Sequence, residues 1–203
     1  GLMKIRMPVT KQELGSLLQE LVLKMDTGDL FVYVQVTRGT GPRNHVFTEG
    51  CGNLWITLTP AGVLDGTVPL QLITVEDTRF FHCNVKTLNL LPSVLASEKA
   101  KQAGCQEAIF YRPGGRVTEC AHSNVHIIQD GMLRTAPTDN LILPGIARAH
   151  LIRMCKKLEI PVNETPFTLD DLFSAEEVLV TSSSNFCLHA DTIDGKTVGG
   201  RQP

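Results

Sequence analysis

The stretch NVKTLNLL, residues 84–91, places Lys86 between two predicted regular elements. Residues 79–85 are expected to form a strand, and residues 92–103 a helix that ends at Gly104. Lys86 is therefore expected where a strand gives way to a turn. Taken alone, a lysine in this position is more often a solvated surface group than a catalytic one, so the rest of the chain decides its role.

Toward the N-terminus, the pattern predicts one helix followed by two strands. Residues 10–13 (TKQE) form a capping box, and apolar residues follow at helical spacing up to Met25. Residues 30–37 alternate in the two-residue period of a strand, and residues 53–58 predict a second strand. We expect residues 1–58 to belong to a small domain, residues 59–67 to connect, and residues 68–203 to form a larger domain.

The larger domain is expected to mix strands and helices, which makes the chain α/β of the α+β type. Residues 105–111, 116–128 and 132–135, separated by glycine-containing turns, predict an antiparallel meander. Gly145 is expected to open a helix whose first turn presents free backbone N–H groups. The remaining predicted elements are strands at 68–75, 160–167 and 177–180, a helix from Thr168, a polar turn at 181–185 and a hairpin at Asp194-Gly195.

Composition excludes several classes of function. Nineteen Lys and Arg against twenty-one Asp and Glu leave a formal charge of -2, so no large positive field exists to attract nucleic acid or anionic lipid. No stretch reaches the roughly 20 apolar residues of a membrane span. The six cysteines are scattered without zinc-ligand spacing, so we expect no metal site and reduced thiols in a cytoplasm.

The standard motifs of hydrolases, nucleotide-binding proteins and zinc proteases are absent from the sequence. Four features are left, namely Lys86, the acidic residue Glu119, the helix start after Gly145 and the hydroxyl-rich turn of residues 182–184. Each has a more common structural explanation. Together, however, an amine, a carboxylate and two anion-binding devices are what pyridoxal phosphate requires.

Four segments resemble the fold-type IV aminotransferases, a group that includes D-amino-acid, branched-chain and aminodeoxychorismate enzymes. Residues 84–91 resemble the segment of the cofactor lysine. Residues 117–125 resemble the segment that binds the pyridine nitrogen, residues 142–148 the phosphate helix, and residues 180–183 the second phosphate turn. All four occur in the order and spacing of the family, over nearly the whole chain.

The resemblance implies a small N-terminal α/β domain and a larger pseudo-barrel β domain with helices. It implies that Lys86 carries pyridoxal 5'-phosphate and moves the substrate proton, and that Glu119 keeps the pyridine nitrogen protonated. The other implied cofactor contacts are Ser123, Asn124, Leu143, Ile146, Ala147, Ser182 and Ser183. Ala147 stands where the D-amino-acid enzymes typically have threonine, so the resemblance also implies the loss of one hydroxyl contact to the phosphate.

Within the group, residues 36–45 are similar to the D-amino-acid aminotransferase loop that holds the substrate α-carboxylate, here with Arg43 and His45. In the family this loop reaches the neighbouring subunit's site, which implies a homodimer acting on D-amino acids and 2-oxo acids. Family members have further segments before the one that starts here and after Pro203. The alternatives are an aminodeoxychorismate lyase, a branched-chain aminotransferase, or an inactive truncated form.

Overall fold

The computed structural model describes residues 2–62 and 66–200 and divides the chain into two compact units. The first unit is Gly1–Val63 and the second is Leu64–Pro203. The division falls within the 59–67 segment in which the sequence predicts a connector.

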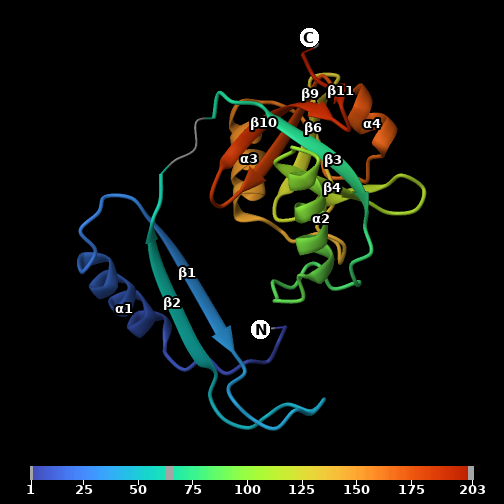
Figure 1. Cartoon of the computed structure of the whole chain (residues 1–203). Helices are drawn as coiled ribbons and strands as arrows, with labels where there is room; N and C mark the ends of the chain where they lie inside the picture. Colours follow the sequence, from blue (N-terminus) through green and yellow to red (C-terminus); the bar gives the residue numbers. More distant parts are fainter. Residues whose placement is uncertain (1, 63–65, 201–203) are drawn as a thin grey trace. The chain divides into compact units, whose positions relative to one another are not determined.

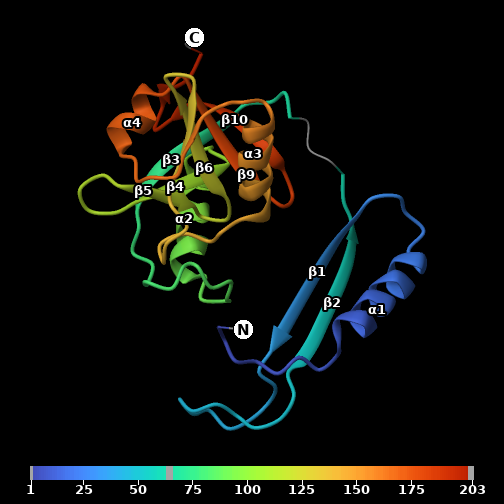
Figure 2. The ribbon, with the colours of Figure 1, turned by 180° about the vertical axis from the view of Figure 1, so that it is seen from behind.

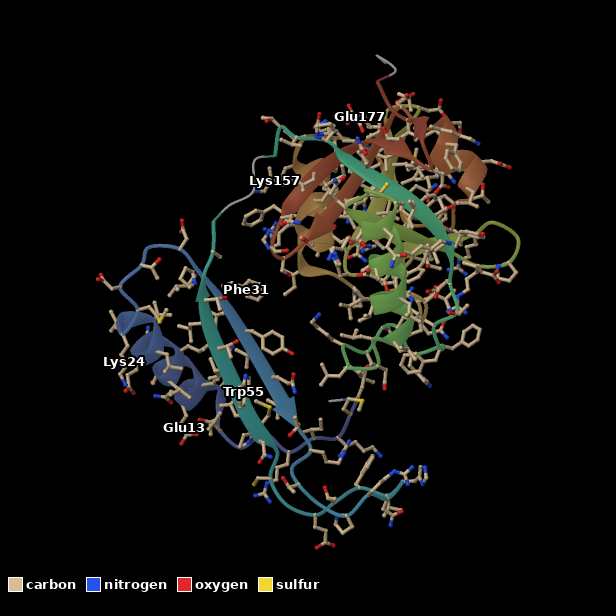
Figure 3. All side chains as sticks on the ribbon, in the orientation of Figure 1. Glu13, Lys24, Phe31, Trp55, Lys157 and Glu177 are labelled. Atoms are coloured by element: carbon tan, nitrogen blue, oxygen red, sulfur yellow. The ribbon has the colours of Figure 1, made fainter. Side chains whose placement is uncertain are left out.

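Helix α1 (Lys11–Leu23) opens the small unit. Its N-cap is Thr10, whose hydroxyl accepts from the Glu13 backbone N–H at 3.2 Å while the Thr10 N–H donates to the Glu13 carboxylate at 2.7 Å. This capping box satisfies two N–H groups that the first turn would otherwise leave unpaired. Figure 3 shows Glu13 near the start of the helix and Lys24 just beyond its end.

The small unit also contains an antiparallel hairpin of β1 (Leu30–Thr37) and β2 (Asn53–Pro60). The pairing is in register along all eight residues of each strand. The sequence predicts β1 with the same bounds and β2 two residues shorter, at 53–58. Phe31 and Trp55 are exposed on this hairpin (Figure 3). The connection between the strands, residues 38–52, is an irregular loop.

The large unit is built on one mixed sheet with the strand order β5-β4-β3-β10-β9-β6-β7-β8, with β11 paired to β10 (Figure 1). Two pairings of β3, with β10 and with β4, are parallel, and β7 and β8 are also parallel; the other pairs are antiparallel. The strands are β3 (Leu70–Glu76), β4 (Glu107–Tyr111), β5 (Val117–Cys120), β6 (Asn124–Gln129), β7 (Met132–Thr135), β8 (Val162–Asn163), β9 (Glu177–Ser182), β10 (Phe186–Ile193) and β11 (Lys196–Thr197).

This sheet curls, and its connectivity explains why. Strand β5 ends at Cys120 and β6 starts at Asn124, although four other strands separate them in the sheet order. A three-residue connection can span this separation only if the sheet bends back on itself. Figure 2 shows β4, β5 and β6 of this sheet from behind. The curled sheet encloses the largest apolar cluster, in which Val117 from β5 and Val125 from β6 both take part.

Helices α2 and α3 cover the outside of the curled sheet, whereas α4 packs its Leu172 into the enclosed cluster. In Figure 1, α2 crosses in front of β3 and β4, and its Ala96 and Ala100 pack against Phe110. Helix α3 lies along β9, and its Ile152 and Cys155 form a second small core with residues of the β7 side of the sheet. The helices are α2 (Leu91–Gln102), α3 (Ile146–Lys157) and α4 (Leu169–Ser174).

The expected strand at residues 79–85 is wrong. The β3–β4 ladder ends where the Asp77 N–H donates to the Tyr111 carbonyl at 2.7 Å. Immediately after, the Arg79 N–H donates to the Asp77 side chain at 3.0 Å, and the Val85 N–H donates to the His82 carbonyl at 3.1 Å. These local bonds replace the sheet ladder, so residues 77–90 form an irregular loop.

Two other sequence expectations also need correction. Residues 116–128 do not form one strand of a meander, because a turn closed by the Cys120 N–H and the Ser123 carbonyl at 2.8 Å divides them into β5 and β6. Of the strand expected at residues 160–167, only Val162–Asn163 pairs. An apolar run can therefore occur without a ladder partner, and in residues 79–85 its Phe80 and Phe81 are exposed.

A buried histidine links three strands of the sheet. His126 on β6 has no exposed surface, and its two ring nitrogens lie 2.9 Å from the hydroxyls of Thr135 on β7 and Thr181 on β9. Burial, with a smaller contribution from the nearby Arg148 charge, lowers the pKa of His126 to about 3. The imidazole is therefore neutral at physiological pH.

This histidine makes the stability of the fold sensitive to acid. Because its folded pKa lies below its ordinary value of 6.5, the unfolded chain binds the proton first as the pH falls. The free energy of unfolding should then decrease by up to about 1.4 kcal/mol per pH unit below pH 6.5 from this group alone. Urea unfolding of the wild type and of His126→Gln at several pH values isolates the effect, and parallel pH profiles would contradict it.

No helix among residues 2–62 and 66–200 is long and apolar enough to cross a membrane.

Candidate active site

A cavity of about 260 Å³ lies within the large unit, where the 79–90 loop meets the β5–β6 turn, the start of α3 and the end of β9. This volume is near the lower end of the roughly 300–1,000 Å³ typical of small-molecule sites. The cavity wall includes nine of the residues that the family resemblance implies, namely Lys86, Glu119, Ser123, Asn124, Leu143, Ile146, Ala147, Ser182 and Ser183.

Lys86 enters the cavity wall from the irregular loop and not from a strand end. The loop is fixed before and after Lys86. Before it, the Cys83 N–H donates to the Asn140 carbonyl at 3.0 Å, and after it α2 starts at Leu91. The Lys86 residue itself is exposed and makes no hydrogen bond or ion pair with any described residue. Its amine is therefore free to react with a molecule in the cavity.

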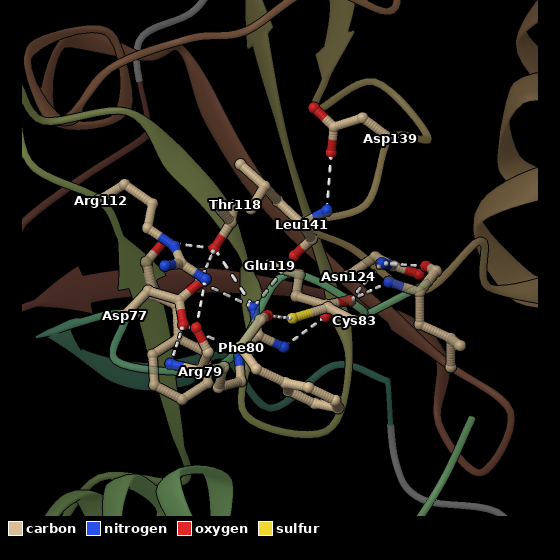
Figure 4. Close-up of polar contacts among 12 residues, drawn as sticks. Asp77, Arg79, Phe80, Cys83, Arg112, Thr118, Glu119, Asn124, Asp139 and Leu141 are labelled. Carbon is tan, nitrogen blue, oxygen red and sulfur yellow. Dashed lines mark hydrogen bonds and ion pairs between the residues drawn. The ribbon is translucent and has the colours of Figure 1, made fainter. Parts of the chain in front are cut away.

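Glu119 is a buried carboxylate on β5, and its two oxygens accept different numbers of hydrogen bonds (Figure 4). Oε2 accepts from the Asn124 side-chain amide at 3.1 Å and from the Leu143 backbone N–H at 3.0 Å. Oε1 accepts from Arg79 Nη1 at 2.5 Å. A carboxylate offers about four lone-pair sites, so within the described chain Oε1 retains one to accept from a group in the cavity.

Arg79, which the sequence analysis did not single out, connects Glu119 to a second buried carboxylate. Its Nε donates to Asp77 Oδ1 and its Nη2 to Asp77 Oδ2, each at 2.9 Å, and its guanidinium lies 4.5 Å from the Phe110 ring centre (Figure 4). Arg112 Nε also lies 3.1 Å from Asp77 Oδ2. Two arginines thus balance two carboxylates, and removal of one charge from such a buried cluster typically costs about 3–5 kcal/mol.

The environment of Glu119 gives its carboxylate a higher proton affinity than that of an ordinary glutamate. Burial raises the pKa of Glu119 to about 7, against the opposing attraction of Arg79. A carboxylate in this condition can form a strong charge-assisted hydrogen bond to a protonated ring nitrogen.

Asn124 and Gly145 bring the start of α3 close to Glu119. The Asn124 amide donates to the Leu143 carbonyl at 3.0 Å as well as to Glu119. A Cβ at position 145 would meet Asn124 Oδ1 at 2.1 Å, so only glycine fits there without displacing the amide. Asn124 and the Leu143 backbone therefore hold Glu119 in place, and the Leu143 side chain is left to line the cavity.

The start of α3 offers backbone donors to an anion. Gly145 is the N-cap and provides no side-chain cap, so the N–H groups of Ile146 and Ala147 have no partner within the helix. On the opposite segment, Ser182 and Ser183 end β9 and begin a turn, in which Ser182 Oγ accepts from the Asn185 N–H at 3.1 Å. An anion between these two segments would meet both backbone and hydroxyl donors.

Three further residues that the sequence predicts for the site are Ser123, Arg43 and His45. Ser123 lines the cavity, but its hydroxyl donates to Glu107 at 2.8 Å. Arg43 and His45 lie on the exposed 38–52 loop of the small unit. Their expected role in binding a substrate carboxylate stays a prediction.

Asp77 and Arg79 are two opposite charges two positions apart, just after β3, which is the only sequence signal for this cluster. Nothing in the sequence, however, pairs them with a glutamate forty positions away.

Comparison with known proteins places this cavity in a family. The model of the class IV aminotransferases matches residues 1–193. A D-alanine aminotransferase of Listeria monocytogenes serotype 4b (strain F2365) is 42% identical over 204 residues, which cover 97% of this chain and 70% of that protein.

Solved structures confirm the predicted fold class. A branched-chain aminotransferase from Thermoproteus uzoniensis with norvaline matches with a TM-score of 0.85 and 23% identity, covering 100% of this chain and 70% of that one. A branched-chain amino acid aminotransferase from Escherichia coli matches with a TM-score of 0.86 and 22% identity, covering 98% of this chain and 68% of that one. The family match over most of the sequence and the shared fold lead to one conclusion: this chain belongs to the class IV aminotransferases.

Proposed function

We propose that this protein transfers amino groups between D-amino acids and 2-oxo acids with pyridoxal 5'-phosphate as cofactor. The observation that carries the proposal is the convergence of Lys86, Glu119 and the uncapped start of α3 on one cavity. The D-alanine aminotransferases to which the chain is similar support the choice of substrate.

The residues around the cavity fit this cofactor. Glu119 would hold the pyridine nitrogen, the N–H groups of Ile146 and Ala147 with Ser182 and Ser183 would hold the phosphate, and the Leu143 side chain would line the ring. The bound cofactor supplies an electron sink for the pair released when the substrate Cα–H bond breaks.

Lys86 has two roles in this proposal. Its amine would hold the cofactor, and the same amine would take the proton from the substrate Cα and donate it again during the transfer. Its lack of a competing hydrogen bond among the described residues leaves the amine available for both roles. Glu119 holds the proton at the pyridine nitrogen, with Arg79, Asn124 and the Leu143 backbone fixing its orientation.

Arg43 and His45 would bind the substrate α-carboxylate. A guanidinium is planar and permanently charged, so it suits two-point capture of a carboxylate. Following the family pattern, we propose that the loop acts on the site of a second copy in a homodimer. A cytoplasmic location is part of the same proposal, because reducing conditions suit six free cysteines.

The substrate class is tested by offering the holoenzyme D-alanine with 2-oxoglutarate and, in parallel, L-leucine with 2-oxoglutarate or aminodeoxychorismate. We expect pyruvate and D-glutamate from the first mixture and little product from the other two. Faster reaction of L-leucine would assign branched-chain transamination instead, and release of pyruvate from aminodeoxychorismate would assign the lyase.

A further inference from the structure

A second buried carboxylate stands behind the cavity, outside the Glu119 cluster. Glu107 on β4 is only 2% exposed. Its Oε1 accepts from the Ala108 N–H at 2.9 Å, and its Oε2 accepts from the Ser123 hydroxyl at 2.8 Å. The Nδ1 atom of His122 lies 2.9 Å from the same Oε2.

This arrangement favours the charged form of His122. A buried carboxylate requires a paired charge, and His122 is the only cationic partner of Glu107 among the described residues. The hydrogen bond to Glu107 raises the pKa of His122, which favours the protonated ring. The His122 side chain is 61% exposed, and its Nε2 atom has no partner in the described chain. One ring nitrogen is therefore anchored by Glu107, and the other is free to donate a hydrogen bond to an anion.

Among the Arg, Lys, Glu and His side chains that line the cavity in the described chain, only His122 has no role in the proposed function. The four are Arg79, Lys86, Glu119 and His122. Arg79 is bound by Asp77 and Glu119, while Lys86 and Glu119 serve the cofactor in the proposed function. The cofactor phosphate has its own donors at the start of α3 and at Ser182 and Ser183. His122 is thus available for an anionic group of the substrate.

The position of His122 also points to the substrate side chain. His122 and Ser182 line both the main cavity and a smaller recess of about 40 Å³. That recess combines apolar walls from Leu70, Val180 and Leu188 with polar atoms from Asn185 and the His122–Glu107 pair. A short methylene chain that ends in a carboxylate matches these surroundings.

We infer that His122, anchored by Glu107, binds the second carboxylate of dicarboxylic substrates, which are acidic D-amino acids and the corresponding 2-oxo acids. This inference rests on the proposed function and assigns His122 as a specificity-determining residue of the same site.

The test compares the wild-type holoenzyme with His122→Gln, which keeps a hydrogen-bonding side chain but removes the charge. Rapid mixing measures kcat/KM separately for D-glutamate and D-alanine. Loss of a charge-assisted hydrogen bond should lower the D-glutamate to D-alanine ratio roughly 10- to 100-fold. The matched control is His150→Gln, on the exposed side of α3 and outside the cavity lining, which should leave the ratio unchanged.

A binding measurement without turnover separates this inference from the proposed function. Calorimetry on the holoenzyme should show that His122→Gln weakens the binding of glutarate by a similar factor and leaves the affinity for butyrate unchanged. Glu107→Gln should produce the same selective loss, and if that variant fails to fold, His122→Gln decides alone. Two results would overturn the inference. One is an equal loss of affinity for glutarate and butyrate, and the other is weaker binding of the cofactor with an unchanged ratio of kcat/KM for D-glutamate to that for D-alanine. If the wild type converts neither D-amino acid, the proposed function fails, and glutarate against butyrate still decides the role of His122.

Discussion

Lys86→Ala is expected to abolish transamination while leaving the fold intact. Proton transfer by a positioned side chain contributes about 100- to 10,000-fold to a rate, and this substitution also removes the covalent attachment of the cofactor. Because Lys86 makes no hydrogen bond or ion pair with any described residue, its loss should not disturb the Glu119 cluster or the start of α3. D-Alanine turnover should therefore fall by at least two orders of magnitude, with unchanged circular dichroism.

The attachment site provides the direct measurement. Borohydride reduction of the wild-type holoenzyme, followed by peptide mapping, should place the pyridoxyl mass on the peptide that contains Lys86. Lys101→Ala, at the exposed end of α2, is the matched control and should keep both the label and the activity. A label on another lysine in the wild type, or full activity of Lys86→Ala, would contradict the assignment.

Arg43→Ala is expected to raise the KM for D-amino acids strongly and to leave the cofactor absorbance normal. A buried carboxylate that loses its arginine partner typically costs about 2–5 kcal/mol, which corresponds to a KM increase of roughly 30- to several-thousand-fold. The proposed cofactor contacts lie in the other unit, on residues 86–183, so the cofactor spectrum should not change. Arg6→Ala, another arginine of the small unit, is a control in which KM should stay within about twofold.

Mixed dimers test whether Arg43 acts on a neighbouring subunit. When Arg43→Ala and Lys86→Ala chains exchange subunits, each mixed dimer should contain one site with both intact residues if the loop crosses to the partner. Activity should then rise from near zero toward a quarter of the wild-type value, because about half of the dimers are mixed and each has one active site. Continued inactivity after demonstrated subunit exchange would show that the loop serves its own chain or no substrate.

Local sequence determined much of the architecture and pointed to the residues that we propose to bind the cofactor. The capping boxes at Thr10 and Thr168 start α1 and α4 where the pattern predicts, because a helix start depends on side chains only three residues apart. The glycine before α3 leaves that helix uncapped for the same local reason. The family-like segments around Lys86 and Glu119 likewise identify these residues from a few neighbouring positions.

Tertiary structure alone decided how these parts meet. The sequence predicted a strand at residues 79–85. In the structure the Asp77 side chain accepts hydrogen bonds from the Arg79 backbone N–H and side chain, so the segment forms a loop. Arg79 reaches Glu119 only because the curled sheet brings β5 beside this loop. The antiparallel pairing of β4 and β5 places His122, in the turn after β5, against Glu107 on β4. Pairings between residues 15 to 40 positions apart depend on how the strands are ordered, and no local periodicity records that order.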